Sequence, residues 1–366
     1  MNPTLTIDLA AVRHNVQAWR DRVAPRPVWA VVKCDAYRTG LGHIARTSLD
    51  AGAQRLCVID IREAQALREL GVGAPIVQIC ATPHSDLSLA VECDVIGSVQ
   101  DVECAKALSQ LASRAGKAVS AHVAIDSGSG WSGVLRRDTE RFAEAVRVLP
   151  NVVWEGAWTH IAGQASMAAQ LERFGAAIAT LRGHGVSVPI LHVASSGPAL
   201  WGATEGAVRI GVGLYGSALG AELGDETTFR TALEVRAPVF MVRRFAEPMP
   251  LGYGSTFVAQ PGQTIVTLRI GYGEGLPKTL AGTGHAVLQG SLCPIVGNIG
   301  MNFTMLLAPP AGSVQVGDEA LLLGDVAGVR LDEVAATAQT IPHNIVTMFG
   351  SGMSRSYKNL RDAVVR

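Results

Sequence analysis

One lysine, Lys33, stands at the end of an apolar run that begins at Val28, where a buried strand is predicted. An amine at the mouth of such a strand is either solvated or used in chemistry. It forms a Schiff base when burial or a neighbouring charge lowers its pKa. Taken alone, a lysine at a strand end is more often only solvated. The other groups predicted beside Lys33 therefore decide its role.

A second group of residues lies in the stretch VRIGVGLYG, where a cation, Arg209, is followed by the small positions Gly211 and Gly213. Barrel enzymes commonly bind a phosphate after their last strands, where small residues let it approach the backbone. Tyr37 adds a hydroxyl group four residues after Lys33. A lysine, a phosphate seat and an arginine together indicate pyridoxal phosphate (PLP) as the cofactor.

These residues need a scaffold that brings strand ends together, and the sequence predicts a (β/α)₈ barrel. Eight β-type runs follow one another, and segments with helical periodicity, such as Arg62–Leu70 and Met167–Leu181, lie between them. The runs are VWAVVK (28–33), RLCVID (55–60), PIVQIC (75–80), CDVIGS (93–98), VSAHVAID (119–126), VVWEGAWTHI (152–161), ILHVAS (190–195) and AVRIGVGLYG (207–216). Such alternation is typical of a closed parallel barrel, which carries its site at the carboxyl ends of the strands.

After about residue 230 the pattern changes to short β runs punctuated by glycine and proline. They include QTIVTLRI (263–270), HAVLQG (285–290), CPIVGNI (293–299) and EALLLG (319–324). We therefore predict a PLP-binding barrel domain over residues 1–230 and a mostly β domain over residues 231–366.

The composition excludes several classes of protein. The 366 residues are 17% charged with a formal net charge of zero, so neither a disordered chain nor a nucleic-acid-binding surface is predicted. No basic segment followed by an apolar one opens the chain, and no run approaches eighteen apolar residues, so we expect a cytoplasmic protein. The six cysteines form no CxxC pair, which favours buried thiols over disulfides and argues against a structural metal.

The chain resembles the bacterial alanine racemases, two-domain enzymes of PLP fold type III, almost from end to end. The resemblance rests on TIDLAAVRHNVQ, VVKCDAY, EAQALRELG, DSGSGWSG, THIAG, LHVASSGPAL and VRIGVGLYG, then on LGYGSTF, IGYGEG, PIVGNIGMN and TIPHNIVTMFGSGMSRSY. The motifs follow the order and spacing of the family. The resemblance implies an amino acid racemase or epimerase.

The resemblance also implies roles for individual residues. Lys33 would hold PLP and move a proton on one face of the substrate, and Tyr253 would do so on the other face. In the family this tyrosine comes from the partner subunit, so a homodimer with shared sites is implied. His160 would lie by the pyridine ring, Arg209 would bind the ring nitrogen, and His192 would support Arg209. The implied phosphate residues are Tyr37, Ser196, Gly211 and Val212, and the implied substrate residues are Tyr272 and Met301. Ser351 near the phosphate and the substrate positions Trp131 and Asn302 are candidates at which this chain departs from the family.

Elementary chemistry supports this pair of bases. Racemisation removes a proton from one face of Cα and returns it on the other, which two opposed groups do better than one. A tyrosine titrates near pH 10, so Tyr253 needs positive charge nearby, which Arg209 and His160 would supply. An arginine cannot give the pyridine nitrogen a full proton. The cofactor is then a weaker electron sink, which favours reprotonation over transamination.

The sequence departs from the family at the position that binds the substrate carboxylate. Trp131 replaces an arginine of the family, and Ala124 replaces the lysine that orients that arginine. Losing a charge-assisted pair of about 1.5–3 kcal/mol would cost roughly two orders of magnitude for an ordinary amino acid. We therefore predict a substrate other than free alanine, either a larger amino acid or an amine whose carboxylate is absent or masked. Trp131 could stack on an aromatic or cationic group. Arg136 or Arg137 could replace the lost arginine, although both are predicted on a solvated helix.

The sequence leaves two other functions open. One is a repurposed enzyme of the same fold type, such as a decarboxylase, aldolase or transaminase. The other is a PLP-binding protein without turnover. The stretch GSGWSG (128–133) matches a dinucleotide-binding pattern, although a barrel strand precedes it. Each residue taken alone also has a purely structural interpretation: His192 as a core histidine, Tyr272 as a packing residue and Ser196 as a turn residue.

Overall fold

The computed structural model describes residues 2–219, 228–309 and 313–360. The chain forms two compact units. The barrel unit comprises Val16–Ala36 and Leu41–Gly211, and the β unit comprises Met1–Asn15, Tyr37–Gly40 and Val212–Arg366. Within the described residues no helix is long and apolar enough to cross a membrane.

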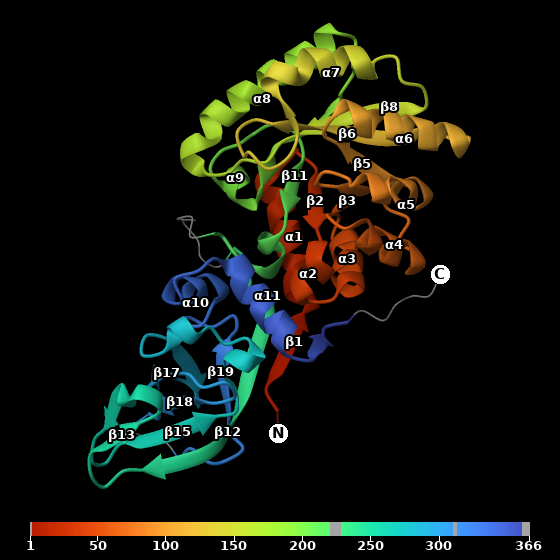
Figure 1. Cartoon of the computed structure of the whole chain (residues 1–366). Helices are drawn as coiled ribbons and strands as arrows, with labels where there is room; N and C mark the ends of the chain where they lie inside the picture. Colours follow the sequence, from red (N-terminus) through yellow and green to blue (C-terminus); the bar gives the residue numbers. More distant parts are fainter. Residues whose placement is uncertain (1, 220–227, 310–312, 361–366) are drawn as a thin grey trace. The chain divides into compact units, whose positions relative to one another are not determined.

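The barrel unit is built on a ring of parallel strands (Figure 1). Its strands are β2 (Val28–Val31), β3 (Arg55–Val58), β4 (Ile76–Gln78), β5 (Val95–Val99), β6 (Val119–Asp126), β8 (Val152–Trp158), β9 (Ile190–His192), β10 (Ala194–Ser195) and β11 (Val208–Ile210), with β7 (Val134–Leu135) beside β6. Strand β11 pairs with both β10 and β2, so the ring nearly closes. The predicted barrel is confirmed, and each of the eight runs is a strand, the seventh being divided at Val193.

Helices cover the outer face of these strands (Figure 1). They are α3 (Leu41–Asp50), α4 (Ile61–Glu69), α5 (Leu87–Glu92), α6 (Val102–Arg114), α7 (Thr139–Val146), α8 (Met167–Gly183) and α9 (Ser196–Leu200). In α4 the Asp60 carboxylate accepts a hydrogen bond from the backbone of Arg62, and Ile61, Ala64 and Leu67 are buried at helical spacing. The predicted helical segments are confirmed by α4 and α8.

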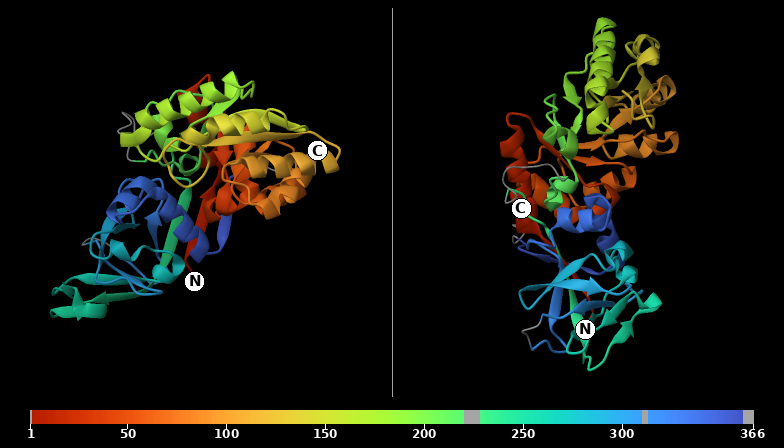
Figure 2. Two further views of the ribbon diagram at one scale, coloured as in Figure 1. Left: turned by 45° about the horizontal axis from the view of Figure 1, so that its top comes forward. Right: turned by 90° about the vertical axis from the view of Figure 1, so that its left-hand side faces the viewer.

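The β unit contains a closed ring of antiparallel strands. These are β12 (Leu233–Arg244), β15 (Thr264–Leu268), β18 (Thr304–Leu307), β17 (Ser291–Val296), β16 (His285–Leu288) and β19 (Glu319–Leu323), and a pairing between β12 and β15 closes the ring. The hairpin of β13 (Met249–Leu251) and β14 (Phe257–Ala259) lies at one end of the unit, as the left-hand view of Figure 2 shows in teal. The predicted mostly β segment is confirmed, and the division at residue 230 stays a prediction.

Several elements were not anticipated from the sequence. The unit also holds α10 (Leu331–Thr337) and α11 (Pro342–Gly352), and strand β1 (Thr4–Asp8) lies between β12 and β20 (Arg355–Lys358). Helices α1 (Leu9–Val23) and α2 (Lys33–Arg38) follow β1 and β2 along the chain. The short 3₁₀ helices are His84–Asp86, Arg136–Asp138, Gln164–Ser166, Val212–Tyr215, Tyr253–Ser255, Tyr272–Glu274 and Lys278–Leu280.

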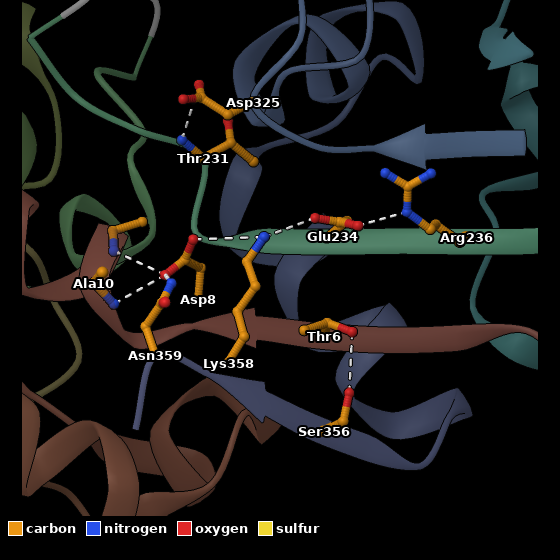
Figure 3. Close-up of polar contacts among 11 residues, drawn as sticks. Thr6, Asp8, Ala10, Thr231, Glu234, Arg236, Asp325, Ser356, Lys358 and Asn359 are labelled. Carbon is orange, nitrogen blue, oxygen red and sulfur yellow. Dashed lines mark hydrogen bonds and ion pairs between the residues drawn. The ribbon is translucent and has the colours of Figure 1, made fainter. Parts of the chain in front are cut away.

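The two ends of the chain are tied together by polar contacts around Lys358 (Figure 3). Its ammonium lies 2.8 Å from Glu234 Oε2 and 3.5 Å from Asp8 Oδ2, and Asn359 Nδ2 donates to Asp8 Oδ1 at 2.8 Å. Burial opposes ionisation of Asp8, but hydrogen bonds from Asn359 and the start of α1 outweigh it and lower the pKa of that carboxyl. These contacts hold β1 and β20 against β12.

Candidate active site

The carboxyl ends of the barrel strands carry the predicted site residues of the barrel unit. Lys33 follows β2 and is half-buried, His160 follows β8, His192 ends β9, and Arg209 lies in β11. Trp131 stands in the loop after β6. Because parallel strands of a barrel end at the same mouth, the fold brings these five positions to one side of the unit.

The backbone after Lys33 is strained. The five residues Cys34 to Arg38 all have positive φ, between 51° and 65°, so α2 turns in the left-handed sense. This conformation costs roughly 1–2 kcal/mol for each residue that carries a Cβ atom. The Asp35 N–H donates to Glu63 Oε1 and the Leu41 N–H to Asp35 Oδ1, each at 2.8 Å. Strain of this kind clusters at functional sites, which supports a role for Lys33.

Arg209 is a buried cation held by neutral acceptors. Its Nη1 donates to His192 Nδ1 at 2.9 Å and to the His192 carbonyl, and its Nη2 donates to the Thr159 carbonyl at 2.9 Å. Burial lowers its pKa to about 10, so it stays charged at neutral pH. Across the described residues it has no ion pair, and its Nε–H makes no hydrogen bond. That N–H remains free for an acceptor.

The loop after β6 is organised by one carboxylate. Asp126 Oδ1 accepts hydrogen bonds from the backbone of Gly128, Ser129 and Gly130 at 2.8, 3.0 and 3.1 Å. The loop runs into β7 rather than into a helix. A dinucleotide-binding motif opens a helix, so that reading of GSGWSG is wrong.

Trp131 is half-exposed beside two other rings. Its ring centroid lies 6.3 Å from that of Trp158 and 6.1 Å from that of His160, the latter edge to face. Ala124 is buried in β6. Arg136 and Arg137 are exposed as predicted, and Arg137 Nε lies 3.5 Å from Asp138 Oδ2. The predicted replacement of the family's arginine and lysine by Trp131 and Ala124 stays a prediction.

The predicted phosphate residues fall in both units. In the barrel unit, Ser196 Oγ accepts a hydrogen bond from the Gly211 N–H at 3.3 Å. In the β unit, Val212 begins a 3₁₀ helix, and the buried Tyr37 ring lies 5.6 Å from the Tyr215 ring. Ser351 is exposed in α11. Ser196 and Gly211 are thus brought together.

The predicted substrate residues of the β unit share one group of turns. Tyr272 opens the turn that ends at Glu274, and Asn302 Nδ2 donates to Glu274 Oε1 at 2.6 Å. The Gly273 N–H donates to the Met301 carbonyl at 2.8 Å. Tyr253 is 68% exposed between β13 and β14, and its ring lies 5.9 Å from that of Phe303.

A set of polar residues inside the barrel was not predicted from the sequence. His122 lies in β6 and Glu155 in β8, and the Glu155 carboxylate receives two hydrogen bonds from Arg55, at 3.1 and 2.8 Å. His122 Nδ1 lies 2.7 Å from His192 Nε2. The available signal was a polar residue interrupting each of the apolar runs VSAHVAID and VVWEGAWTHI.

The cysteine prediction needs correction in part. All six cysteines are free, and Cys57, Cys104 and Cys293 are buried. Cys34 is exposed, and Cys80 and Cys93 are only partly buried, because they stand at strand or helix ends rather than inside strands. Burial raises the pKa of the Cys57 and Cys104 thiols to about 12. No group of three or more histidine, cysteine or acidic side chains suited to a metal occurs among the described residues.

The buried histidines predict a loss of stability in acid. Burial lowers the pKa of both below the usual 6.5, with Glu155 partly opposing this at His122 and the charge of Arg209 adding to it at His192. The unfolded chain therefore binds more protons below pH 6.5 than the folded chain. As the pH falls from about 6.5, we expect the free energy of unfolding to drop by up to about 1.4 kcal/mol per pH unit for each histidine, until the folded pKa is reached.

Denaturant unfolding between about pH 7.5 and about pH 5.5 measures this dependence. A His122→Gln variant should show a shallower dependence than the unchanged protein. His285→Gln, at an exposed position on β16, should keep the original slope. An unfolding free energy that is constant over this range would contradict the prediction.

Fold and site together define a class of protein. It is a parallel barrel with a β domain, and the mouth of the barrel presents Lys33, His160, His192 and the buried Arg209. The model of the alanine racemase N-terminal domain matches residues 7–218, and that of the C-terminal domain matches residues 232–357. The chain belongs to the alanine racemase family, whose members are PLP-dependent isomerases.

Individual relatives agree over almost the whole chain. Alanine racemase 2 of Caldanaerobacter subterraneus subsp. tengcongensis is 32% identical over 98% of this chain and 95% of its own. The alanine racemase of D-cycloserine-producing Streptomyces lavendulae has a similar structure, with a TM-score of 0.91 at 28% identity, covering 98% of this chain and 97% of that one. The Bartonella henselae enzyme, solved with covalently bound pyridoxal phosphate, gives a TM-score of 0.87 at 26% identity, covering 98% and 99%.

Proposed function

We propose that this chain is a PLP-dependent amino acid racemase that uses Lys33 and Tyr253 as its two bases and prefers a substrate other than free alanine. The proposal rests on the surroundings of Arg209. A buried guanidinium with no anionic partner among the described residues, and with one unbound N–H, lies at the barrel mouth that also presents Lys33. An aromatic nitrogen is a suitable acceptor for that N–H.

The residues at the mouth fit the cofactor in type. The Lys33 amine would hold its aldehyde, Arg209 Nε–H would donate to its ring nitrogen, and His160 would lie beside its ring. The Ser196 hydroxyl and the backbone of Gly211 would bind its phosphate, and the phosphate roles of Tyr37 and Val212 stay predictions from the resemblance. When bound, PLP withdraws electrons and makes the Cα–H of an attached amino acid acidic.

The protein's own groups then move the proton. Lys33 Nζ takes or returns it on one face, and the Tyr253 hydroxyl does so on the other. We propose that Tyr253 is supplied by the partner subunit of a homodimer, in keeping with its exposure. Arg209 donates a hydrogen bond without transferring its proton, which limits electron withdrawal and favours return of the proton to Cα.

The rings of Trp131, Trp158 and His160 support the substrate proposal. Trp158 is buried, whereas the Trp131 ring beside it is half-exposed and can stack on an aromatic or cationic side chain. No guanidinium stands at position 131 to grip a carboxylate. We propose a larger amino acid as substrate.

A Trp131→Arg substitution tests the cause of this preference. We expect kcat/KM for alanine to rise about 10- to 100-fold, because a bidentate charge-assisted pair is worth about 1.5–3 kcal/mol. Steady-state kinetics with alanine measure the change. Leu135→Arg, at an exposed position of β7, is the matched control and should leave the constant unchanged. No gain in the Trp131→Arg variant would contradict the assignment.

The whole proposal is tested on the purified protein in two steps. Borohydride should fix the PLP chromophore onto the peptide that contains Lys33. Incubation in deuterated buffer with alanine and with aromatic and basic amino acids should then show Cα exchange with inversion, fastest for a larger amino acid. Absence of the chromophore, or release of carbon dioxide or an aldehyde, would defeat the racemase proposal. Fastest turnover of alanine would defeat only the substrate part.

A further inference from the structure

A row of polar side chains runs through the barrel from Arg209 to Glu155. Arg209 Nη1 lies 2.9 Å from His192 Nδ1, and His192 Nε2 lies 2.7 Å from His122 Nδ1. His122 Nε2 lies 3.3 Å from Glu155 Oε2. We call these four residues the relay. Both histidines and Arg209 are buried, and Glu155 is partly exposed.

The relay runs from the mouth into the barrel. His192 is the last residue of β9, at the mouth that presents Lys33. Glu155 is the fourth of the seven residues of β8, and its carboxylate is paired with Arg55, the first residue of β3. The relay therefore connects the site with a carboxylate inside the barrel.

The two end residues of the relay, Arg209 and Glu155, determine which nitrogen of each histidine carries the proton. An arginine can only donate, so His192 Nδ1 must accept and His192 must carry its proton on Nε2. That N–H donates to His122 Nδ1, so His122 carries its proton on Nε2 as well. An ionised carboxylate can only accept, and Glu155 Oε2 faces this last N–H at 3.3 Å, where the two groups are not aligned for a hydrogen bond and attract each other by charge. Arg209 and Glu155 therefore favour the same state of both histidines, which is neutral and protonated on Nε2.

Aromatic rings enclose the two histidines and keep them from other hydrogen-bond partners. The His192 ring lies 4.7 Å from that of Trp29 and 6.0 Å from that of Trp158, centroid to centroid. The other titratable or charged neighbours are Arg55 and the Cys57 thiol, which burial keeps protonated. Enclosed histidines cannot change partners without leaving an unpaired buried group, which is costly.

We propose that Glu155 and His122 are positioning residues for Arg209. The Glu155 carboxylate attracts the proton of His122 Nε2 and so fixes the tautomers of both histidines. The hydrogen bonds among His122, His192 and Arg209 then hold the Arg209 Nε–H directed to the cofactor's ring nitrogen. This inference rests on the proposed function, because it takes PLP as the acceptor. The arrangement resembles a carboxylate that orients a histidine behind a metal site, with arginine in place of the metal.

Binding of two probes to the full-length protein, freed of PLP with hydroxylamine, tests the proposal. The probes are PLP and its 1-deaza analogue, which has carbon in place of the ring nitrogen. The unchanged protein should prefer PLP by about tenfold or more, the value of one charge-assisted hydrogen bond. In His122→Leu and Glu155→Leu that preference should fall to about threefold or less. Glu155→Gln keeps an acceptor for His122 and should restore it.

Two outcomes would overturn the proposal, and a third separates it from the proposed function. Folded Leu variants that keep the original preference would show that the relay does not position Arg209. Nitrogen NMR of the imidazoles in the unchanged protein reads the tautomers without any variant or cofactor, and a proton on Nδ1 of either histidine would also refute it. If the unchanged protein binds neither probe, the proposed function fails instead, whereas the tautomers still decide whether the relay exists.

Discussion

Replacing Lys33 with alanine is expected to lower racemisation at least about 10⁴-fold, the largest effect of any single substitution in this chain. The substitution removes both the amine that would hold the cofactor and one of the two groups that would move the proton. PLP should still bind through Arg209 and the phosphate residues, but borohydride should no longer attach it to the protein. Racemisation assays and mass spectrometry after reduction measure the two losses.

The control for this substitution is Lys106→Ala. Lys106 is an exposed lysine on α6 that pairs with Glu103 on the same helix, at 3.0 Å. Surface pairs of this kind are worth little, so activity and covalent attachment should both remain. If the Lys33→Ala variant kept covalent PLP, the amine would have to be sought elsewhere in the chain.

Replacing Tyr253 with phenylalanine should lower racemisation by about 10²- to 10⁴-fold, the usual contribution of one acid–base group. The change removes a single hydroxyl from a ring that is mostly exposed. Because Lys33 is unaffected, one enantiomer should still exchange its Cα proton with deuterated solvent, now without inversion. Loss of inversion with exchange retained is the expected signature of a missing second base.

The matched control lies on the same hairpin. Val258→Ala shortens an exposed side chain of β14 and should leave the rate unchanged. Exchange assays with each enantiomer and chiral chromatography distinguish the cases. Equal loss of exchange for both enantiomers in the Tyr253→Phe variant would argue against two bases, and an unchanged rate would remove Tyr253 from the mechanism.

The scaffold could be predicted because it follows from local patterns. Apolar runs of strand length alternate with helical periodicity, and this alternation favours a parallel barrel whatever the contacts between strands. The same local logic placed Lys33 at the end of the first barrel strand and Arg209 in the last one. It failed for α10, α11 and β1, since a strand such as Thr4–Asp8 is defined by pairing with β12 and with β20, some 350 residues away in the chain.

The features of the site also divide into those predicted from the sequence and those revealed by the structure. From the sequence alone came the candidate lysine, tyrosine and arginine, the likeness to the family, and the prediction that Trp131 stands in place of its carboxylate-binding arginine. Only the tertiary structure revealed the left-handed turn after Lys33, the rings beside Trp131, and the relay from Arg209 to Glu155. Hydrogen-bond direction depends on which atoms meet, and His122 meets His192 across 70 residues of chain. No periodicity encodes such a contact, because closure of the barrel alone brings β6 and β9 near enough for it to form.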